Sequence, residues 1–495
     1  MNRPTALDLA RDFRIDEMFF STTDRKGVIR EGNDVFVRVS GYGRDELLGC
    51  PHNIIRHPQM PRAVFRLVWD YLSKGVPVAG LIKNMAKDGK YYWVVAYLTP
   101  IEGGFLSIRF KPSSPLLPVV EGLYREMLAR EADAEVRGSS RAEAMDEAAR
   151  HLTEALLRLG FDGYEAFMRT MLHEELKCRD AQIATQKLSL FPATLPAGAV
   201  GETLRASLES IHASGRQAYA QINTLYGQLD EFAALNEKLR EKSTFILGLT
   251  KDFRFIAFNA ALRSSRIGEE ARGLTVIADY LGTASDSATK TVAMLTNQID
   301  AIMGRLRAVT FNLAAARLQI EMVLSFSAEL AAGRHEADGS GTTHCRMIED
   351  LQRAFAPTID RAVKALLELE HELNGLAVHS EDMRRKMLTL QVAQVGGLVE
   401  AQRLRDDDSF KVMFADLRQG VDGTKRELGE LDTIGERLSA LASETPAISA
   451  AIARAVQAMD REVRALAMAA ADAPPREPAK PAAGRVSERE LAGVA

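Results

Sequence analysis

The residues able to do chemistry are few, and none of them forms a catalytic set. The nine histidines are scattered, and no G-x-x-x-x-G-K-[ST] phosphate loop, H-E-x-x-H motif or kinase signature occurs. Cys50, Cys178 and Cys345 are widely separated and form no C-x-x-C pair, which argues against a disulfide framework or a zinc site. The sequence therefore predicts a protein that is not an enzyme and has no metal site.

A group of cationic, polar and aromatic residues lies in the first quarter of the chain. Residues 41–49 read GYGRDELLG and residues 51–61 read PHNIIRHPQMP, followed by KN at 83–84, KDG at 87–89 and YYWV at 91–94. Residues 18–112 thereby resemble the PAS domain of bacterial aerotaxis receptors. In that family the domain binds FAD noncovalently and responds to its redox state, so the resemblance implies a flavin site.

The same resemblance implies roles for five residues. A flavin needs an apolar slot for its ring and a few placed polar or cationic groups. Arg56 and His57 would meet its polar or anionic parts, Trp69 would pack against it, and Asn33 and Asn84 would hydrogen-bond it.

One position departs from the family pattern, because Gln59 stands where the family commonly has an aspartate. Loss of that carboxylate would weaken or change cofactor binding. Two other interpretations stay open: the domain binds a different ligand, or it is an interaction module without a ligand. In the second case Arg56 and His57 order a loop, and Trp69 and Trp93 belong to the core.

A second resemblance lies in residues 256–279, IAFNAALRSSRIGEEARGLTVIAD, which are similar to the signalling tip of methyl-accepting chemotaxis receptors. The resemblance implies a chemotaxis histidine kinase and its coupling protein as partners. The residues expected to face that partner are Asn259, Arg263, Arg266, Glu269, Arg272 and Val276.

The tip also departs from its family. Arg263 stands where the family has a glutamate, and residues 280–282, YLG, replace glutamate, valine and arginine. These changes alter charge on the expected partner surface, so a hairpin with altered or lost partners is the competing interpretation. The acidic pairs at 174–175 and 269–270 are too few and wrongly placed to predict methylation.

The elements that must position these residues fall into two kinds. Residues 19–23 and 28–30 around a turn at 24–27, and residues 78–84 and 91–97 around a turn at 87–90, read as two β-hairpins, and residues 105–110 supply a fifth strand. With short helices between the hairpins, this predicts an α+β domain with one antiparallel sheet. Residues 113–200 follow as a connector of short helices, interrupted at 138–140, 160–163 and 191–196.

The chain from residue 201 onward predicts long helices. Nine successive residues at a spacing of seven are apolar, namely Leu204, Ile211, Ala218, Leu225, Phe232, Leu239, Ile246, Phe253 and Ala260. Such a repeat is typical of a coiled coil or bundle helix. With a turn near Gly268, residues 201–331 are predicted to form an antiparallel helical hairpin.

A further helical region is predicted over residues 344–466, with a turn near 406–409. A shift of 136 residues superimposes 256–281 on 392–417 without a gap and aligns identical residues at 257/393, 262/398, 276/412 and 281/417. A second hairpin is therefore plausible, and duplication stays unproven. Residues 470–495, rich in alanine and proline, are predicted to form a disordered tail.

The composition limits the functional classes. The net charge is -4 and no basic block occurs, which argues against a nucleic-acid partner. No run approaches 18 apolar residues, and the N-terminus carries acidic residues, so neither a membrane span nor a signal peptide is expected. The expected location is therefore the cytoplasm.

The combined prediction is a homodimeric, cytoplasmic PAS sensor for redox, oxygen or energy state. It would hold FAD and signal through a chemoreceptor-like hairpin to a chemotaxis-type kinase complex. A PAS-linked scaffold for another regulator, without kinase control, is the alternative. A flavoenzyme is a third class, which no acid-base pair in the sequence supports.

Overall fold

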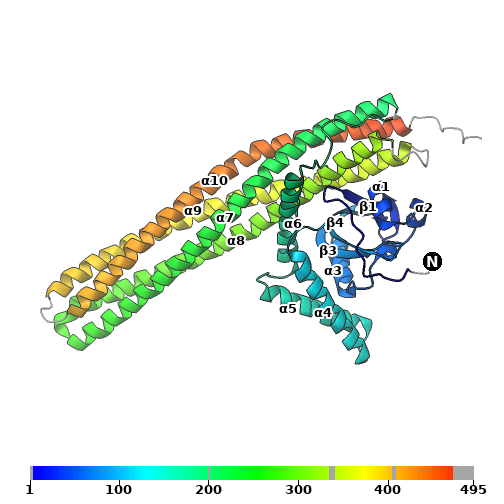
Figure 1. The fold of residues 1–495 in the computed structure, drawn as a ribbon. Coiled ribbons are helices and arrows are strands. Elements are labelled where there is room, and N and C mark those ends of the chain that lie inside the picture. The colour runs from blue at the N-terminus through cyan, green and yellow to red at the C-terminus, as the bar shows by residue number, and fades with distance from the viewer. Residues whose placement is uncertain (1–3, 199–200, 334–340, 404–407, 472–495) are drawn as a thin grey trace, which may run out of the picture.

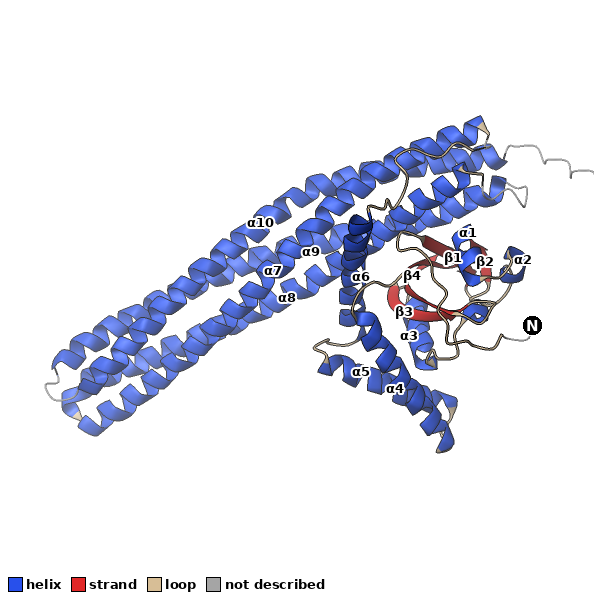
Figure 2. Ribbon diagram, viewed as in Figure 1, coloured by secondary structure: helices blue, strands red, loops and turns tan. Residues whose placement is uncertain are grey.

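The structure, a computed structural model, describes residues 4–198, 201–333, 341–403 and 408–471 (Figure 1). An α+β domain with a five-stranded sheet lies beside one end of a long bundle of four helices, and Figure 2 shows that the strands are confined to this domain. The predicted fold class is confirmed. Among the described residues, no helix has the length and apolarity needed to cross a bilayer.

The sheet is antiparallel throughout, in the order β2-β1-β5-β4-β3. Its strands agree with the five that the sequence predicts. They are β1 (Met18–Asp24), β2 (Ile29–Gly32), β3 (Val78–Met85), β4 (Tyr91–Ile101) and β5 (Gly104–Phe110). Gly27 and Gly89 have φ angles of 79° and 83° in the two hairpin turns, a conformation that favours glycine.

Four short helices lie between the two hairpins of the sheet and cover one of its faces. They are α1 (Asp34–Ser40), α2 (Arg44–Leu47), η1 (His52–Ile55) and α3 (Arg62–Ser73). Because successive strand residues point to opposite faces, the other face of the sheet must be buried elsewhere. The bundle helices α8 (Arg272–Ala331) and α9 (Gly341–Arg403) and the connector helix α6 (Tyr164–Gln186) supply that cover.

Four helices of one chain form the bundle. They are α7 (Glu202–Ile267), α8 (Arg272–Ala331), α9 (Gly341–Arg403) and α10 (Asp408–Ala471). α8 packs against α7 and α9, and α10 packs against the same two helices, so the four helices form a closed ring (Figure 1). The heptad repeat is accordingly buried: Leu225, Leu239, Ile246 and Phe253 are each no more than 1% exposed.

The two halves of the bundle are related by the same shift that aligns their sequences. α7 ends at Ile267 and α8 begins at Arg272, and a shift of 136 residues carries these positions onto the end of α9 at Arg403 and the start of α10 at Asp408. Several predicted features lie outside the described residues: the side chain of Phe232, residues 406–407 of the turn predicted near 406–409, and the tail beyond residue 471.

Three helices connect the sheet to the bundle: α4 (Leu116–Val136), α5 (Arg141–Arg158) and α6 (Tyr164–Gln186). Two of the predicted interruptions fall between them. Ser140 begins α5 with a capping box, in which its hydroxyl accepts from the amide of Glu143 and the Glu143 carboxylate accepts in return. The Tyr124 hydroxyl on α4 and the Tyr164 hydroxyl on α6 donate to the carbonyls of Leu81 and Ala79, which fixes both helices to β3.

The outer face of the sheet packs directly on α8. The Phe20 ring on β1 lies 5.2 Å from that of Phe326, and the Tyr97 ring on β4 lies 6.2 Å from that of Phe311. Nearly every residue of α8 from 311 to 331 is buried as a result. A helix that is covered on all sides is a core element, so this end of α8 belongs to the sheet domain and to the bundle at once.

A buried ion cluster joins the connector to the same part of α8. A guanidinium nitrogen of Arg179 on α6 lies 2.6 Å from a carboxylate oxygen of Glu321, and Nε of Arg317 lies 2.9 Å from the other oxygen. Arg317 also binds Asp180. Nε of Arg179 donates to the carbonyl of Ile15, and its guanidinium lies 5.2 Å from the centre of the Phe110 ring. The cluster therefore touches the bundle, the connector and the sheet domain.

The buried seam makes a stability prediction. Replacing Leu225, which is 1% exposed, by aspartate would place a charge in the apolar seam and should lower the free energy of unfolding by about 4 kcal/mol or more. Leu262→Asp is the control on the same helix, because Leu262 is 45% exposed. Urea unfolding followed by circular dichroism would measure both, and equal stability of the two variants would contradict the seam.

Candidate functional site: an apolar cavity with a buried arginine

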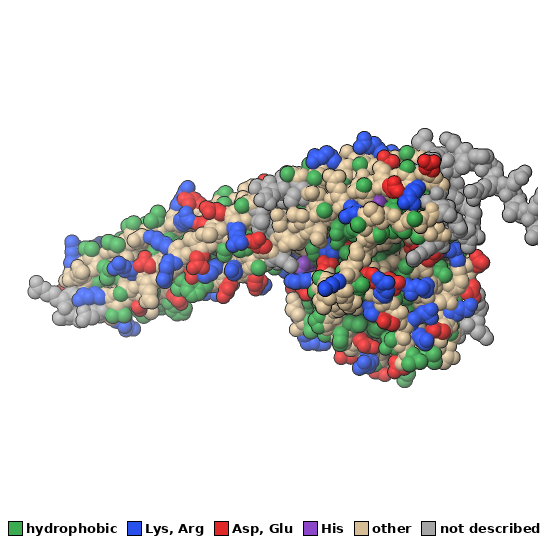
Figure 3. Space-filling model, turned by 45° about the horizontal axis from the view of Figure 1, so that its top comes forward, with side chains coloured by type: hydrophobic (Ala, Val, Ile, Leu, Met, Phe, Trp, Pro, Cys, Tyr) green, Lys and Arg blue, Asp and Glu red, His purple; other side chains and the backbone are tan. Residues whose placement is uncertain are grey.

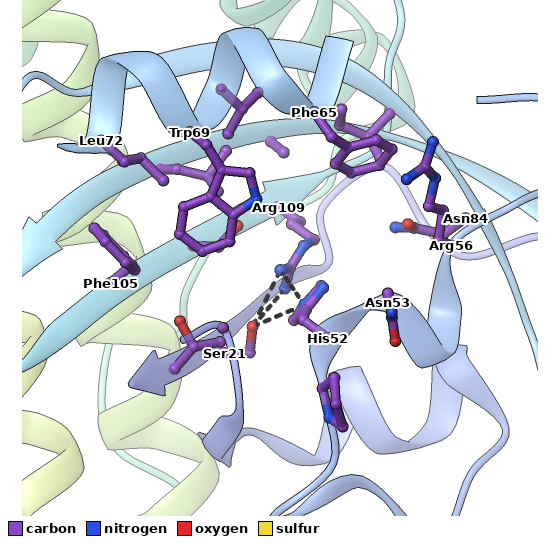
Figure 4. A pocket seen from close by; sticks show the side chains of 18 of the residues that line it. Ser21, His52, Asn53, Arg56, Phe65, Trp69, Leu72, Asn84, Phe105 and Arg109 are labelled. Carbon is purple, nitrogen blue, oxygen red and sulfur yellow. Dashed lines mark hydrogen bonds between the residues drawn. The ribbon is translucent and has the colours of Figure 1, made fainter. Parts of the chain in front are cut away.

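A cavity of about 340 Å³ lies between the sheet and the helices that cover its inner face (Figure 4). Its volume falls within the range of small-molecule sites. Most of the wall is apolar. The apolar and aromatic lining comes from α3 (Phe65, Val68, Trp69 and Leu72) and from the strands and the β4–β5 hairpin (Ile82, Ala96, Leu98 and Phe105).

Three polar side chains meet at the sheet side of the cavity. The guanidinium of Arg109 on β5 donates to Oγ of Ser21 on β1 at 3.0 and 3.1 Å, and one of its nitrogens lies 2.7 Å from Nε2 of His52. Figure 4 shows Arg109 in the middle of this group, pointing toward the other two. Because a guanidinium only donates, Nε2 of His52 must be its acceptor and carries no proton.

The charge of Arg109 is not neutralised by an acidic side chain. Arg109 is 3% exposed, and among the described residues no carboxylate pairs with it. Burial lowers the pKa of Arg109 to about 10. Burial, and then the charge of Arg109, hold the pKa of His52 well below its ordinary 6.5, so the imidazole is neutral.

Two further polar atoms face the cavity without a partner. Nδ2 of Asn84 and Oγ of Ser107 belong to side chains that line the cavity, and both atoms lack a hydrogen bond within the described part of the chain. The two residues are 3% and 5% exposed. Buried polar groups in proteins are nearly always hydrogen-bonded, so the described residues leave the hydrogen-bonding capacity of these two atoms unused.

The structure brings three of the five predicted cofactor residues to the cavity: Arg56, Trp69 and Asn84. Arg56 stacks over the ring of Phe65 at 4.2 Å and donates to the carbonyl of Met60. The Trp69 ring lies 5.4 Å from that of Phe105. These contacts hold both side chains at the cavity wall.

The other two predicted residues lie elsewhere. Asn33 caps the start of α1: its Oδ1 accepts from the amides of Phe20 and Phe36, and its Nδ2 donates to Glu329 of α8. His57 is buried outside the cavity lining, and its Nδ1 accepts from the amide of Gln59. The structure therefore places Asn33 at the junction with the bundle and His57 in the loop before α3.

Gln59, the departure from the family pattern, is also outside the cavity lining. Its Oε1 accepts a hydrogen bond of 2.7 Å from Nζ of Lys83. Burial lowers the pKa of Lys83, although Glu121 acts in the opposite direction. The missing carboxylate would therefore act on Lys83 rather than on the cavity itself.

All six residues expected to face a partner are exposed. Figure 1 places the ends of α7 and α8 that carry them at the far end of the bundle from the sheet. Gly268 turns the chain there with a φ of 85°. Acidic and basic side chains are mixed along the face in Figure 3, without a continuous patch of one sign.

Sequence reasoning missed Ser21, His52, Ser107 and Arg109. A signal was present in β5, where Phe105, Ser107 and Arg109 alternate with apolar residues, so that the polar ones share one face. An arginine in a short strand is ordinarily read as exposed. Only the covering helices show that this face is the inner one.

The fold and cavity define a PAS domain attached to a helical bundle. Residues 30–107 match the family model described as the PAS fold. Within the described residues, no three metal-ligating side chains gather in one place.

The relatives are similar to this chain over that domain. The aerotaxis receptor of Escherichia coli is 44% identical over 119 residues, which are 23% of this chain and 24% of the receptor. The biofilm dispersion protein BdlA of Pseudomonas aeruginosa is 30% identical over 82 residues, 16% of this chain and 20% of BdlA. A crystal structure of the PAS domain of a protein from Colwellia psychrerythraea is similar to 19% of this chain, and the match covers 85% of the chain in that crystal structure. The two are 24% identical, with a TM-score of 0.17. The chain thus matches about a quarter or less of the length of the curated relatives.

Because the imidazole of His52 is neutral in the folded chain, the free energy of unfolding should depend on pH. Below about pH 6.5 the unfolded chain protonates this histidine while the folded chain does not, so the unfolded state binds more protons and stability falls as pH is lowered. The His52 contribution should reach at most about 1.4 kcal/mol per pH unit in that window and vanish above it.

Urea unfolding of wild type and His52→Asn between about pH 5 and pH 7.5 would measure the difference. His371→Asn on the exposed surface of α9 controls for the loss of one histidine. Parallel pH curves for wild type and His52→Asn would mean that His52 titrates alike in the folded and unfolded chains.

Proposed function

We propose that this protein is a flavin-binding sensor of redox, oxygen or energy state that signals through the far end of its helical bundle. The observation that carries the proposal is that β1 and β5 border the cavity on one face of the sheet and contact the bundle and connector on the other. Ser21 and Arg109 face the cavity, while their neighbours Phe20 and Phe110 contact Phe326 and Arg179 on the other side. A ligand in the cavity would thus act on strands that support the bundle.

The cavity suits a flavin ring. The ring is flat, apolar on its faces and polar along one edge, which fits a wall of Phe65, Trp69 and Leu72 opposite the unpartnered atoms of Asn84 and Ser107. When bound, a flavin supplies a group that takes up and releases electrons. The residues of this chain would orient the ring, exclude water and supply hydrogen bonds. The similarity to the aerotaxis receptor supports the same assignment.

For the output, we propose that residues 201–331 and 344–466 act as two hairpins of one signalling domain. Its partner would be a chemotaxis-type histidine kinase complex, reached through Asn259, Arg263 and Arg266 at the end of α7 and Glu269, Arg272 and Val276 beyond the turn. The bundle is closed by four helices of one chain, so a second copy is not needed to cover the seam. A homodimer would have to use the outer surfaces of the helices.

The scaffold alternative keeps the same fold with a different partner. Apolar side chains on the outer surface of the bundle favour some protein contact: Phe258 is 65% exposed and Val276 is 65% exposed. Arg263, in place of the family's glutamate, changes the charge that a kinase-coupling partner would meet. Binding measurements decide between the two alternatives.

The cofactor proposal predicts that the purified chain carries flavin or takes it up from solution, with an absorption spectrum of the bound form. Asn84→Ala and Arg56→Ala should each weaken FAD binding about tenfold to a hundredfold, because each removes a hydrogen-bonding or charged group from the wall. Arg25→Ala is the matched control, since Arg25 is exposed and outside the cavity lining. A folded wild-type chain that stays colourless with excess FAD would sink the proposal.

The partner proposal predicts opposite effects of two substitutions. Arg263→Glu should strengthen binding to a conventional coupling protein from the same cell, because it restores the charge of the receptor tip, and Arg272→Ala should weaken any binding that exists. Arg240→Glu, exposed on α7 about 35 Å from Arg263 along the helix, is the charge-matched control. Titration calorimetry would measure the four proteins. If neither tip substitution changes binding, the scaffold alternative is favoured.

A further inference from the structure

We propose that Arg109 determines the specificity of the cavity, which selects a ligand whose buried end carries a negative charge or gains one on reduction. The inference rests on the proposed flavin function and adds the residue that would set the redox response. Arg109 lies outside the motifs that carry the family resemblance.

The buried arginines of this chain differ in whether a carboxylate neutralises them. Arg179 and Arg317, at 0% and 1% exposure, are paired with the carboxylate of Glu321 at 2.6 and 2.9 Å. Arg109, at 3% exposure, has the neutral Ser21 and His52, the rings of Phe19 and Phe36 at 5.9 and 5.5 Å, and the buried phenol of Tyr92 as neighbours, but no carboxylate among the described residues. A buried charge without a counter-charge is costly to hold. Arg109 lines the cavity, where a ligand can supply the missing charge.

Arg109 is also more deeply buried than the other two cationic residues of the cavity wall. Lys26 and Arg56 also line the cavity, but Lys26 is exposed and Arg56 is partly exposed, so both reach solvent. The phosphates of a flavin nucleotide are strongly hydrated and would remain near these two side chains. Arg109 lies deeper, against the sheet, where an apolar ring would be buried. The guanidinium therefore meets the ring end of the ligand and not its phosphates.

A charge at the ring end follows reduction. One electron from an external one-electron donor such as dithionite adds one negative charge to the ring and oxidises the donor by one electron, and no bond of the protein forms or breaks. A guanidinium in an apolar surrounding stabilises the charged form more than the neutral form. Arg109 would thus raise the reduction potential of a bound ring, and the neutral His52 beside it would add no second positive charge.

The test uses the full chain with Arg109→Gln and, as the matched control at the solvent end, Arg56→Gln. FAD and riboflavin share the ring and differ in phosphate, so their dissociation constants separate the two ends of the cavity. Arg109→Gln should weaken both ligands equally and shift the reduction potential to more negative values, by about 59 mV for each tenfold loss of preference for the reduced ring. Arg56→Gln should weaken FAD more than riboflavin and leave the potential unchanged. An unchanged potential in Arg109→Gln would overturn the inference.

Two further measurements separate this inference from the proposed function. Without ligand, Arg109→Gln should unfold at the wild-type temperature or above, because it removes an unpaired buried charge, and a markedly lower temperature would show that Arg109 is structural. If the wild type binds no flavin, the proposed function fails, and benzoate and neutral benzamide become the probes. Stabilisation by benzoate alone, lost in Arg109→Gln, would uphold the anion site, and equal effects of the two compounds would overturn it.

Discussion

The structure depends on the pairing of Arg179 with Glu321, both 0% exposed, at the point where sheet, connector and bundle meet. Burial alone would raise the pKa of Glu321, but the charges of Arg179 and Arg317 together hold it below its ordinary value. Leaving one of these charges unpaired would cost about 3 to 5 kcal/mol, so α6 cannot slide along α8 without breaking the pair. The same guanidinium binds the carbonyl of Ile15 and covers the ring of Phe110. The position of the sheet on α8 is therefore fixed by a contact with strict geometry, which apolar packing alone does not provide.

With this contact fixed, one face of the sheet borders the cavity and the other packs on the bundle. Neighbouring residues of a strand point to opposite sides, so the cavity and the bundle are separated by a single layer of backbone. At the start of β1 the arrangement is especially direct. Oδ1 of Asn33 accepts from the amide of Phe20, and its Nδ2 donates both to the carbonyl of Met18 and to the carboxylate of Glu329 on α8. A shift of β1 caused by a ligand at Ser21 would be transmitted to α8 through Phe20 and Asn33. Such a contiguous set of packed and hydrogen-bonded groups is a physical route for coupling, and it needs no motion of the connector.

The sequence predicted the features that rest on periodicity and failed on those that depend on tertiary context. The seven-residue repeat identified Leu225 and its equivalents because a helix buried on one side must repeat its apolar residues at that spacing. Asn33 was assigned to a ligand, but an asparagine that caps a helix and one that binds a cofactor have the same sequence pattern. Arg109 was missed because alternation shows which residues share a face and does not show which face is covered. The ring of four helices was also not predictable, since an apolar seam is satisfied equally by a second hairpin or by a second copy.

Because one chain supplies all four helices of the bundle, its two hairpins differ in sequence at the end far from the sheet. Residues that coincide under the shift of 136 and lie in the seam keep their character: Ala257 and Ala393, like Leu281 and Leu417, are identical and buried. The outer surface is less uniform: the exposed Val276 and Val412 are identical, but Arg263 coincides with Val399 and Tyr280 with Asp416, and these four are exposed as well. Packing constrains the seam in both hairpins, whereas nothing in the bundle requires the outer surfaces to agree. In a dimer of identical hairpins each surface residue would occur twice around the axis. In this chain the two tips are chemically distinct, so a partner that recognises one of them has a single place to bind on each bundle.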